Sequence, residues 1–292
     1  NNGNEVLVID DASSDDSVDY IKLNFPQVTL LSNEKNLGFG KSSNRGIKAA
    51  NNGLVILINS DVIVTENFIN PLIEHFKNKD TFAVSPKIYA WDKQTFVAGA
   101  YTGAFKQGYI HIWNEKDVDT SSVINHSVPT IFAIGCAVCF RKSDFLALGG
   151  FDKIYEPYSW EDIDLSYRAL KMGLRVIYEP GSMVFHKIHG TIGPFNRSVE
   201  IKNELLFTWK NITDLNKIIP HFWLLPLRYF IKKTERGSFV KGYIFALSKL
   251  FQAVGERFLE RRNILSTDKQ VLNKFLEFPE YRGKRKQNSN KT

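Results

Sequence analysis

The sequence predicts an α/β protein built on a parallel sheet, and two observations lead to this class. Two continuous apolar runs, Glu5–Ile9 and Leu54–Ile58, have the length and composition of strands buried on both faces. The chain between them alternates helix and strand patterns, which is typical of parallel α/β folds. The runs end in polar residues, at Asp10-Asp11 and Asn59-Ser60-Asp61. Because ligands of such folds bind beyond the carboxyl ends of the strands, we expect a site there.

The other elements are expected from apolar periodicity and turn residues. After the first strand come a helix reaching 20–23, a strand over 28–31 and a helix over 41–50. After the second strand come a helix over 62–79, strand and turn over 81–90, a strand over 132–140, a helix over 160–172 and strands over 175–178 and 183–186. Residues 91–130 show no clear period and are expected to form a sheet edge or loops over the site.

The helix over 160–172 carries two adjacent carboxylates, Glu161 and Asp162, in its first turn. We expect Ser159 to cap it, with Asp162 three residues later as in a capping box, and Gly173 to end it. Apolar residues on two flanks indicate a mostly buried helix whose first turn is held rigidly. Taken alone, these acids need no function, because the helix dipole favours acids at this end.

Composition limits the classes of protein that this chain can be. Its 292 residues, 43% of them hydrophobic, are enough for one large globular domain, or for one with an appendage. Cys136 and Cys139 lie in an expected strand and are interpreted as ordinary buried thiols. With no other cysteine we expect no disulfide framework or structural zinc site, which fits a reducing compartment.

The positive charge of the chain lies in its C-terminal third. Residues 201–292 contain 19 basic and 8 acidic residues, a net of +11, whereas residues 1–200 have a net of −4. We expect a helical, basic, membrane-proximal region over 201–282 and a disordered basic tail over 283–292. Aromatic and basic residues together favour a helix lying on an anionic membrane, because no apolar run approaches the roughly 20 residues of a membrane span.

Two other interpretations of this region remain open. One is a helical cap packed on the rest of the protein, with its cations solvated. Nucleic-acid binding is a weaker interpretation, because the region has no nucleic-acid motif and the rest of the chain is acidic. We therefore expect no nucleic-acid partner.

Four segments together resemble the inverting glycosyltransferases of family 2, which have the GT-A fold, a Rossmann-like fold of nucleotide-diphospho-sugar transferases. The segments are Val8–Asp15, Asn36–Gly46, Asn59–Asp61 and Gly149–Asp162. Each segment is weak evidence alone, but their order and spacing are specific. Bacterial rhamnosyltransferase-like enzymes of surface polysaccharide assembly are the most similar members, and the resemblance covers about residues 5–195.

The resemblance implies a role for several residues in binding a nucleotide sugar. Asp11 would accept a hydrogen bond from the nucleotide base, while Asp10 would fix the turn. Asn44 and Arg45 would lie near the diphosphate. Asp61 stands at the metal-binding Asp of the family's DxD motif, whose first Asp is Asn59 in this chain.

The resemblance also implies the metal and the catalytic groups. His186 would complete the site of a Mn²⁺ or Mg²⁺ ion bound by Asp61. Asp162 matches the general base, and Glu161 beside it would orient that base or bind the acceptor. A single base and a direct attack give inversion at the anomeric carbon.

The family begins with a strand and a helix, roughly thirty residues, that hold part of the nucleotide. This unit is missing from the sequence, so residues 1–200 match an N-terminally truncated GT-A domain. We therefore expect the sheet to lack a central strand and the base pocket to lack a wall.

The resemblance implies transfer of a sugar from a nucleotide-diphosphate sugar to a saccharide or lipid-linked acceptor, in cell-surface polysaccharide biosynthesis. The protein would work in the cytoplasm, peripherally at the inner face of the cell membrane. The alternative is a catalytically impaired, truncated relative that acts as a saccharide- and membrane-binding module. The missing unit favours the alternative, and the retained Asp61, Asp162 and His186 disfavour it.

Overall fold

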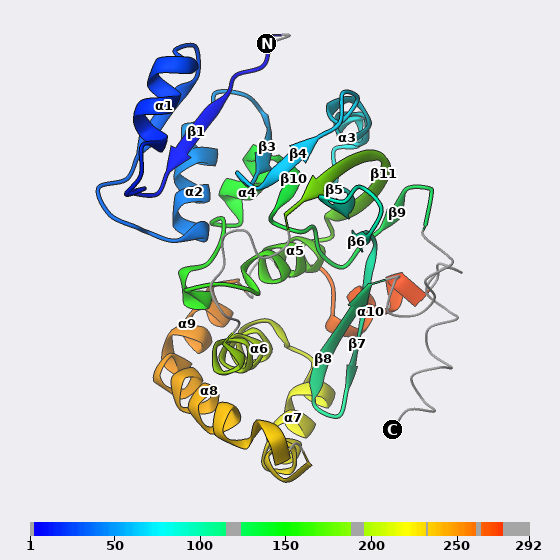
Figure 1. Ribbon diagram of the computed structural model, residues 1–292. Helices are drawn as coiled ribbons and strands as arrows, with labels where there is room; N and C mark the ends of the chain where they lie inside the picture. Colours follow the sequence, from blue (N-terminus) through cyan, green and yellow to red (C-terminus); the bar gives the residue numbers. More distant parts are fainter. Residues whose placement is uncertain (1–2, 115–123, 188–195, 232, 261–263, 277–292) are drawn as a thin grey trace.

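The computed structural model describes residues 3–114, 124–187, 196–231, 233–260 and 264–276. Helix α5 (Glu161–Lys171) lies near the centre of this part. In Figure 1 the strands β1, β3, β4 and β10 lie above α5, and the helices α6, α7 and α8 lie below it. The first turn of α5 therefore faces the region where strands and helices meet.

The N-terminal part of the chain forms a two-stranded parallel sheet. Strand β1 (Leu7–Asp10) pairs with β2 (Thr29–Ser32), with Leu7 opposite Thr29. Helix α1 (Ser17–Asn24) connects the two strands, and α2 (Phe39–Ala49) leads from β2 to β3 (Leu54–Ile58). The expected strand–helix alternation of this segment is confirmed.

The main sheet is mixed, although the sequence predicted a mostly parallel one. Its strand order is β3-β10-β5-β11-β4, with β6 beside β5 and β9 beside β11. The bounds are β4 Val62–Val64, β5 Thr81–Ala90, β6 Phe96–Ala98, β9 Val128–Pro129, β10 Ala137–Arg141 and β11 Arg175–His186. Within it β5 and β11 are parallel, and the other pairs are antiparallel. The described chain between β5 and β10 contains strands and no helix, so β10 returns antiparallel without a helical crossover.

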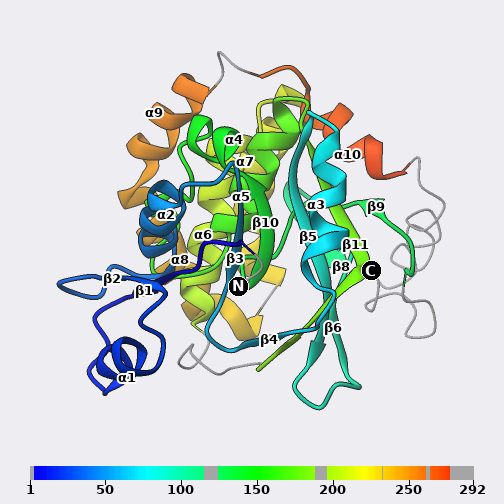
Figure 2. The same ribbon diagram turned by 90° about the horizontal axis from the view of Figure 1, so that it is seen from above.

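Strands β1 and β3 are not hydrogen-bonded to each other. In the part of the chain that the structure describes, β1 pairs only with β2 and β3 pairs only with β10. Helix α2 packs against both strands, and it lies close to β1, because a Cβ on Gly46 would be 2.8 Å from Cγ1 of Ile9. Figure 2 shows β1 and β2 to one side of the main sheet. Strands β1 and β3 therefore belong to separate sheets that α2 connects.

Residues 91–130 contain more regular structure than expected. Strands β7 (Tyr101–Lys106) and β8 (Tyr109–Asn114) form a hairpin. Its two-residue turn has positive φ at both Gln107 and Gly108, which matches the right-handed twist of the strands. Two short helices, α3 (Ile69–Glu74) and α4 (Lys142–Ala147), flank the main sheet.

The C-terminal helices share the core of the α/β part. They are α6 (Arg197–Asn211), α7 (Leu215–Ile231), α8 (Arg236–Ser248), α9 (Leu250–Glu260) and α10 (Asp268–Leu276). Phe207 of α6 is fully buried, and its ring lies 5.2 Å from that of Tyr167 in α5. The expected domain boundary at residue 200 therefore falls inside a helix that belongs to the main core. The tail expected over 283–292 lies outside the described residues.

Among the helices that the structure describes, none combines the length and the apolar character needed to cross a membrane. Both cysteines are buried and free, as expected for ordinary thiols.

Candidate active site

A cleft of 2770 Å³ runs from the ends of β1 and β3, past the start of α5, to β8, α6 and α7. Five residues singled out in the sequence line it: Asp11, Asp61, Glu161, Asp162 and His186. They come from four separate parts of the chain. The fold thus brings most of the expected site residues to one surface.

Asp61 and His186 converge at one end of this cleft. The Oδ1 atom of Asp61 lies 3.3 Å from Nε2 of His186. The cause is strand pairing, because His186 stands opposite Val62 in the antiparallel pair of β11 and β4. The backbone oxygen of Asp61 accepts hydrogen bonds from Lys187 N at 3.0 Å and from Trp91 Nε1 at 3.2 Å. The expected convergence of the two side chains is confirmed.

This pair has the chemistry to hold a divalent cation together with a substrate. Among the described residues, no group of three or more His, Cys, Asp or Glu side chains is placed to hold a metal ion. Mg²⁺ is commonly bound through one or two carboxylates with substrate phosphates and water completing its shell, and an imidazole favours Mn²⁺. The residues present therefore fit a metal bound jointly with a diphosphate.

Asp162 is fixed by two backbone N–H groups. Its Oδ2 accepts from Gly135 N at 3.2 Å and its Oδ1 accepts from Ile163 N at 2.8 Å. A Cβ on Gly135 would lie 3.0 Å from the Phe39 ring but 3.8 Å from Cβ of Asp162, so the glycine leaves room for Phe39 rather than for Asp162. Burial raises the pKa of the Asp162 carboxyl, and the two hydrogen bonds act in the opposite direction.

Glu161 is a second acid beside Asp162, and both side chains are half-buried. Burial, and then the charge of Asp162, raise the pKa of Glu161 to about 8. Its Oε2 atom is buried and has no hydrogen-bond partner. At neutral pH the two carboxyls therefore share one proton, with Glu161 as its main carrier.

The turn before α5 differs from the expected capping box. Ser159 and Trp160 both adopt the left-handed conformation, with φ of 65° and 76°, and neither side chain caps the helix. Instead, Nδ2 of Asn203 in α6 donates to the backbone oxygens of Tyr155, Tyr158 and Ser159 at 2.8, 2.8 and 2.9 Å. The capping prediction was wrong because the left-handed turn places Trp160, one residue after Ser159, at the N-cap position of α5, and no side chain caps the helix there.

Helix α5 is anchored by a buried ionic network. Asp164 accepts from Arg168 Nε at 2.8 Å and lies 3.1 Å from Lys210 Nζ of α6. Burial alone would raise the pKa of Asp164, but the charges of Arg168 and Lys210 lower it to about 2. Any movement of α5 relative to α6 would break these pairs and leave a buried charge unpaired. The network therefore holds the helix that carries Asp162 in one position.

Asp11 organises the loop that follows β2. Its Oδ1 accepts from Leu37 N and Asn33 Nδ2, and its Oδ2 accepts from Gly38 N, each at 2.8 Å. Burial would raise the pKa of Asp11, but these hydrogen bonds outweigh it and lower the pKa. Asp10 fixes the following turn, as expected, through Ser13 N at 3.2 Å.

Asn44 and Arg45 do not reach the cleft. The amide of Asn44 makes two hydrogen bonds to the backbone of Phe151, at 2.8 and 2.9 Å. The Arg45 guanidinium donates to Ser32 O at 2.8 Å and to Asn33 Oδ1. Both side chains connect α2 to neighbouring loops, and the placement near a diphosphate that the resemblance implies for them stays a prediction.

Several other residues of the cleft have no signal in the sequence. Arg197, Glu200 and Glu204 of α6 and Arg228 of α7 line the end away from Asp61. They match no motif, and two of them, Glu204 and Arg228, belong to the region interpreted as membrane-proximal. Only the packing of α6 against α5 brings them near the acids.

Comparison with known proteins gives the family. The model of glycosyl transferase family 2 matches residues 1–146, which is half of the chain. The chain belongs to glycosyl transferase family 2. The match covers β1, α2 and β3, including Asp11 and Asp61, so the resemblance of these segments is confirmed.

Two curated relatives of this family 2 chain come from Mycobacterium tuberculosis. A pre-mycofactocin glycosyltransferase is 26% identical over 186 residues, which cover 63% of this chain and 37% of the relative. An N-acetylglucosaminyl-diphospho-decaprenol L-rhamnosyltransferase is 28% identical over 208 residues, covering 64% of this chain and 67% of the relative. The chain thus spans little more than a third of the first of these relatives.

A solved structure supports the fold. GalNAc-T7, crystallised with UDP, GalNAc and Mn²⁺, superposes with a TM-score of 0.58 at 16% identity, over 90% of this chain and 52% of that chain. At this identity the likeness concerns the fold alone. The family 2 chain has the GT-A fold, as the sequence predicted.

Proposed function

We propose that this protein transfers a sugar from a nucleotide-diphosphate sugar to a saccharide or lipid-linked acceptor, with inversion at the anomeric carbon. The observation that carries the proposal is one cleft holding both the Asp61–His186 pair, 3.3 Å apart, and the half-buried carboxylate of Asp162, which two backbone N–H groups bind. The Asp61–His186 pair suits a metal that binds the leaving diphosphate, and the Asp162 carboxylate suits the attacking hydroxyl. The donor sugar is proposed to be a hexose, with rhamnose as one candidate because of the mycobacterial relative.

At the donor end, Asp61 and His186 would hold Mn²⁺ or Mg²⁺. When bound, such an ion neutralises the negative charge that develops on a leaving diphosphate. Asp11 lies in the same cleft, and an interaction with the nucleotide base remains the role proposed for it. Its carboxylate already accepts three hydrogen bonds, so any contact with the base uses the remaining lone pairs.

At the acceptor end, Asp162 would take the proton of the attacking hydroxyl as the bond to the anomeric carbon forms. The hydrogen bonds from Gly135 and Ile163 orient its carboxylate, and burial raises its proton affinity toward the range that suits a base at neutral pH. The protonated Glu161 beside it adds no second negative charge. One direct displacement inverts the configuration.

One observation favours the alternative, a catalytically impaired module that binds saccharides and membranes. Within the described residues, β1 and β3 each leave one edge unpaired where they line the cleft. A base pocket that is open there would hold a nucleotide weakly. The two functions differ in whether a donor is turned over.

The test is a screen of purified protein with Mn²⁺ and a panel of UDP-, TDP- and GDP-sugars, with release of the nucleotide as the readout. The proposal expects Mn²⁺-dependent hydrolysis of one donor class and, by NMR, a first-formed sugar of inverted anomeric configuration. Retained configuration would exclude the direct displacement. No turnover of any donor, with saccharide binding intact, would support the alternative.

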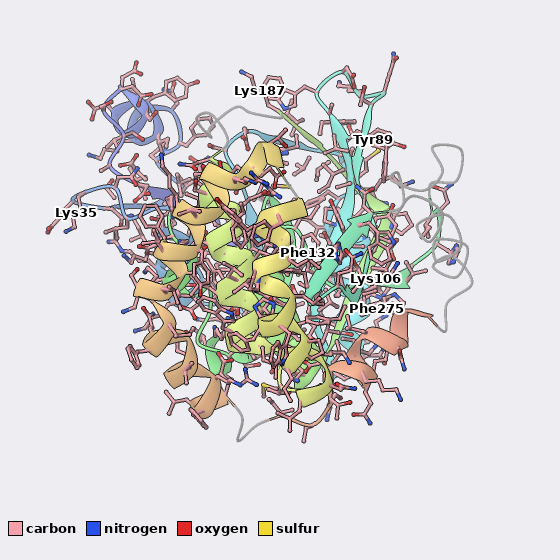
Figure 3. All side chains as sticks on the ribbon, turned by 90° about the horizontal axis from the view of Figure 1, so that it is seen from below. Lys35, Tyr89, Lys106, Phe132, Lys187 and Phe275 are labelled. Carbon is pink, nitrogen blue, oxygen red and sulfur yellow. The ribbon has the colours of Figure 1, made fainter. Side chains whose placement is uncertain are left out.

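We also propose that the protein works in the cytoplasm, peripherally on an anionic membrane, through helices α7–α9. These helices form the near face in Figure 3. Their large exposed apolar side chains are Leu215, Ile219, Phe222, Trp223, Leu227, Phe230, Val240, Ile244, Phe245, Leu247, Phe251, Phe258 and Leu259. Trp223 is 81% exposed and Phe251 is 91% exposed. Water disfavours so large an apolar surface, and an interfacial location covers it.

The membrane proposal is tested by sedimentation with vesicles of anionic and of neutral lipid at low ionic strength. Preferential binding to anionic vesicles, partly released by salt, is expected because the C-terminal third carries a net of +11. Equal binding to both vesicle types would contradict the proposed electrostatic attraction between the basic C-terminal third and anionic lipid. A role in cell-surface polysaccharide biosynthesis is proposed on the same basis and requires a membrane-borne acceptor.

A further inference from the structure

The cleft continues beyond Glu161 into a region that the proposed chemistry does not use. We call it the α6–α7 arm and define it by six residues: Tyr109, Arg197, Glu200, Glu204, Leu227 and Arg228. Figure 1 shows α6 and α7 on the side of α5 opposite to β3 and β4, whose connecting loop carries Asp61. The arm therefore lies across the acids from the proposed donor end.

The polar side chains of the arm are arranged as guanidinium–carboxylate pairs. Arg228 Nη2 donates to Glu204 Oε2 at 2.7 Å, and the Arg228 guanidinium stacks 4.3 Å from the centre of the Tyr109 ring. Arg197 pairs with Glu200 and, at 3.2 Å, with Glu235. The arm thus carries no unbalanced positive charge that would select a phosphate or another anion.

Two donors in these pairs are buried and have no partner, namely Nη1 of Arg228 and Nε of Arg197. A sugar hydroxyl both donates and accepts. Paired guanidinium and carboxylate groups offer both functions side by side, and the Tyr109 ring offers an apolar face.

The arm begins next to the acids. Trp160, directly before Glu161, also lines the cleft, and its ring lies 5.3 Å from that of Phe207 in α6. The buried Oε2 of Glu161 is another polar atom without a partner. A saccharide in the arm would therefore present its reacting hydroxyl near Glu161 and Asp162.

The far side of the arm meets the exposed apolar face of α7. Leu227 lines the cleft and is 48% exposed, and Trp223, one turn earlier on the same helix, is 81% exposed. The polar arm and the apolar helix face therefore adjoin at Leu227. A ligand with a sugar head and an apolar tail matches both surfaces, and a free sugar matches only one of them.

We infer that the α6–α7 arm is the acceptor subsite and that it binds a neutral saccharide carried on a lipid. That the ligand is the acceptor of a sugar rests on the proposed glycosyl transfer. That the arm binds a saccharide rests on the residues of the arm. Arg197, Glu200, Glu204 and Arg228 bind the sugar hydroxyls, and Leu227 with the face of α7 contacts the lipid chain.

The test measures binding without turnover. Saturation-transfer NMR follows a panel of octyl glycosides of neutral hexoses, below their micelle concentrations, beside the matching free sugars. The inference expects sugar-proton signals for at least one octyl glycoside, with affinity about tenfold lower in Glu204→Gln, which loses a charge-assisted partner. Leu227→Ser should reduce the preference for the octyl glycoside over the free sugar.

Matched controls are Glu74→Gln and Leu23→Ser, which change an exposed acid and an exposed leucine outside the arm. Thermal unfolding checks that every variant is folded. Binding unaffected by Glu204→Gln and Leu227→Ser, or absent for the whole panel, would overturn the inference. A lack of donor hydrolysis with arm-dependent glycoside binding would overturn the proposed transfer and leave the arm assigned as a saccharide site.

Discussion

The side-chain nitrogen of Asn203 lies 2.9 Å from the backbone oxygen of Ser159, across the junction between α6 and the turn that leads to Asp162. The same nitrogen also contacts the oxygens of Tyr155 and Tyr158. Ser159 and Trp160 sit in the left-handed region, which costs free energy for residues with a Cβ. A residue beyond the family-matched segment therefore holds the proposed catalytic turn in place.

Replacing this amide should impair transfer without removing the donor site. Asn203→Asp keeps the size of the side chain and loses its donor, which costs about 1–3 kcal/mol for the buried groups left unpaired. We expect transfer to fall by about tenfold while Mn²⁺-dependent nucleotide binding stays within about twofold. Steady-state transfer and nucleotide titration measure the two effects. An unchanged transfer rate in a variant with lowered thermal stability would reduce Asn203 to a purely structural role.

The Glu161 carboxyl should make stability depend on pH. Its pKa in the folded protein is about 8, above the ordinary value of 4.5. The folded state therefore binds the extra proton, and the stabilisation present below about pH 4.5 is lost as pH rises toward 8. Glu161→Gln removes this group, so its unfolding temperature should fall less between pH 5 and pH 8 than that of the wild type. Equal slopes for the two proteins would contradict the raised pKa.

The Asp61–His186 pair should set the dependence on metal. Asp61→Ala should abolish Mn²⁺-dependent nucleotide binding, because it removes the only carboxylate of the pair. His186→Ala should raise the Mn²⁺ concentration needed for binding by at least about tenfold, since one ligand is lost. Fluorescence titration of nucleotide binding at several Mn²⁺ concentrations measures both. If His186→Ala needs the same Mn²⁺ concentration as the wild type, His186 is not a ligand of the metal.

The open edges of β1 and β3 should accept one more strand. Both edges line the cleft, and Val6 and Ile58 are each 40% exposed although they belong to apolar runs. Fusing an apolar strand and a helix before residue 1 should raise the unfolding temperature by on the order of 10 °C, because several apolar side chains become buried.

The control for this fusion carries two prolines in the added strand, which cannot complete the ladder hydrogen bonds. The intact fusion should also bind nucleotide more tightly than the unfused chain. If both fusions melt at the temperature of the unfused chain, the gap between β1 and β3 is not a strand site.

The local sequence was enough to predict the site residues that lie at the ends of buried strands. Asp61 and His186 could be placed together because each follows an apolar run that had to be a buried strand. Ser159 could not be interpreted correctly, because it lies in a left-handed turn whose backbone oxygens accept hydrogen bonds from Asn203, 44 residues later. Asn44 likewise serves Phe151, 107 residues away. Polar side chains on helices are used by whichever backbone packs beside them, and that is set by tertiary structure.

The direction of strand pairing in the main sheet could not be predicted from the local sequence either. The apolar run of β10 is compatible with either strand direction, and the absence of a helix in the described chain before it decides the antiparallel pairing. The residues of the α6–α7 arm were missed for a related reason. Charged residues in a basic, aromatic region look solvated until α6 is seen to pack against α5.

The most direct test of the account is the transfer rate of Asp162→Asn in Mn²⁺. This change keeps the shape of the side chain and removes the proton acceptor. We predict that transfer falls by about 10²–10⁴-fold while nucleotide binding changes by less than about twofold, with Asp80→Asn, an exposed aspartate outside the cleft, as the matched control. Transfer within a few fold of the wild type, in a variant that still binds the donor, would contradict the assignment of Asp162 as the base.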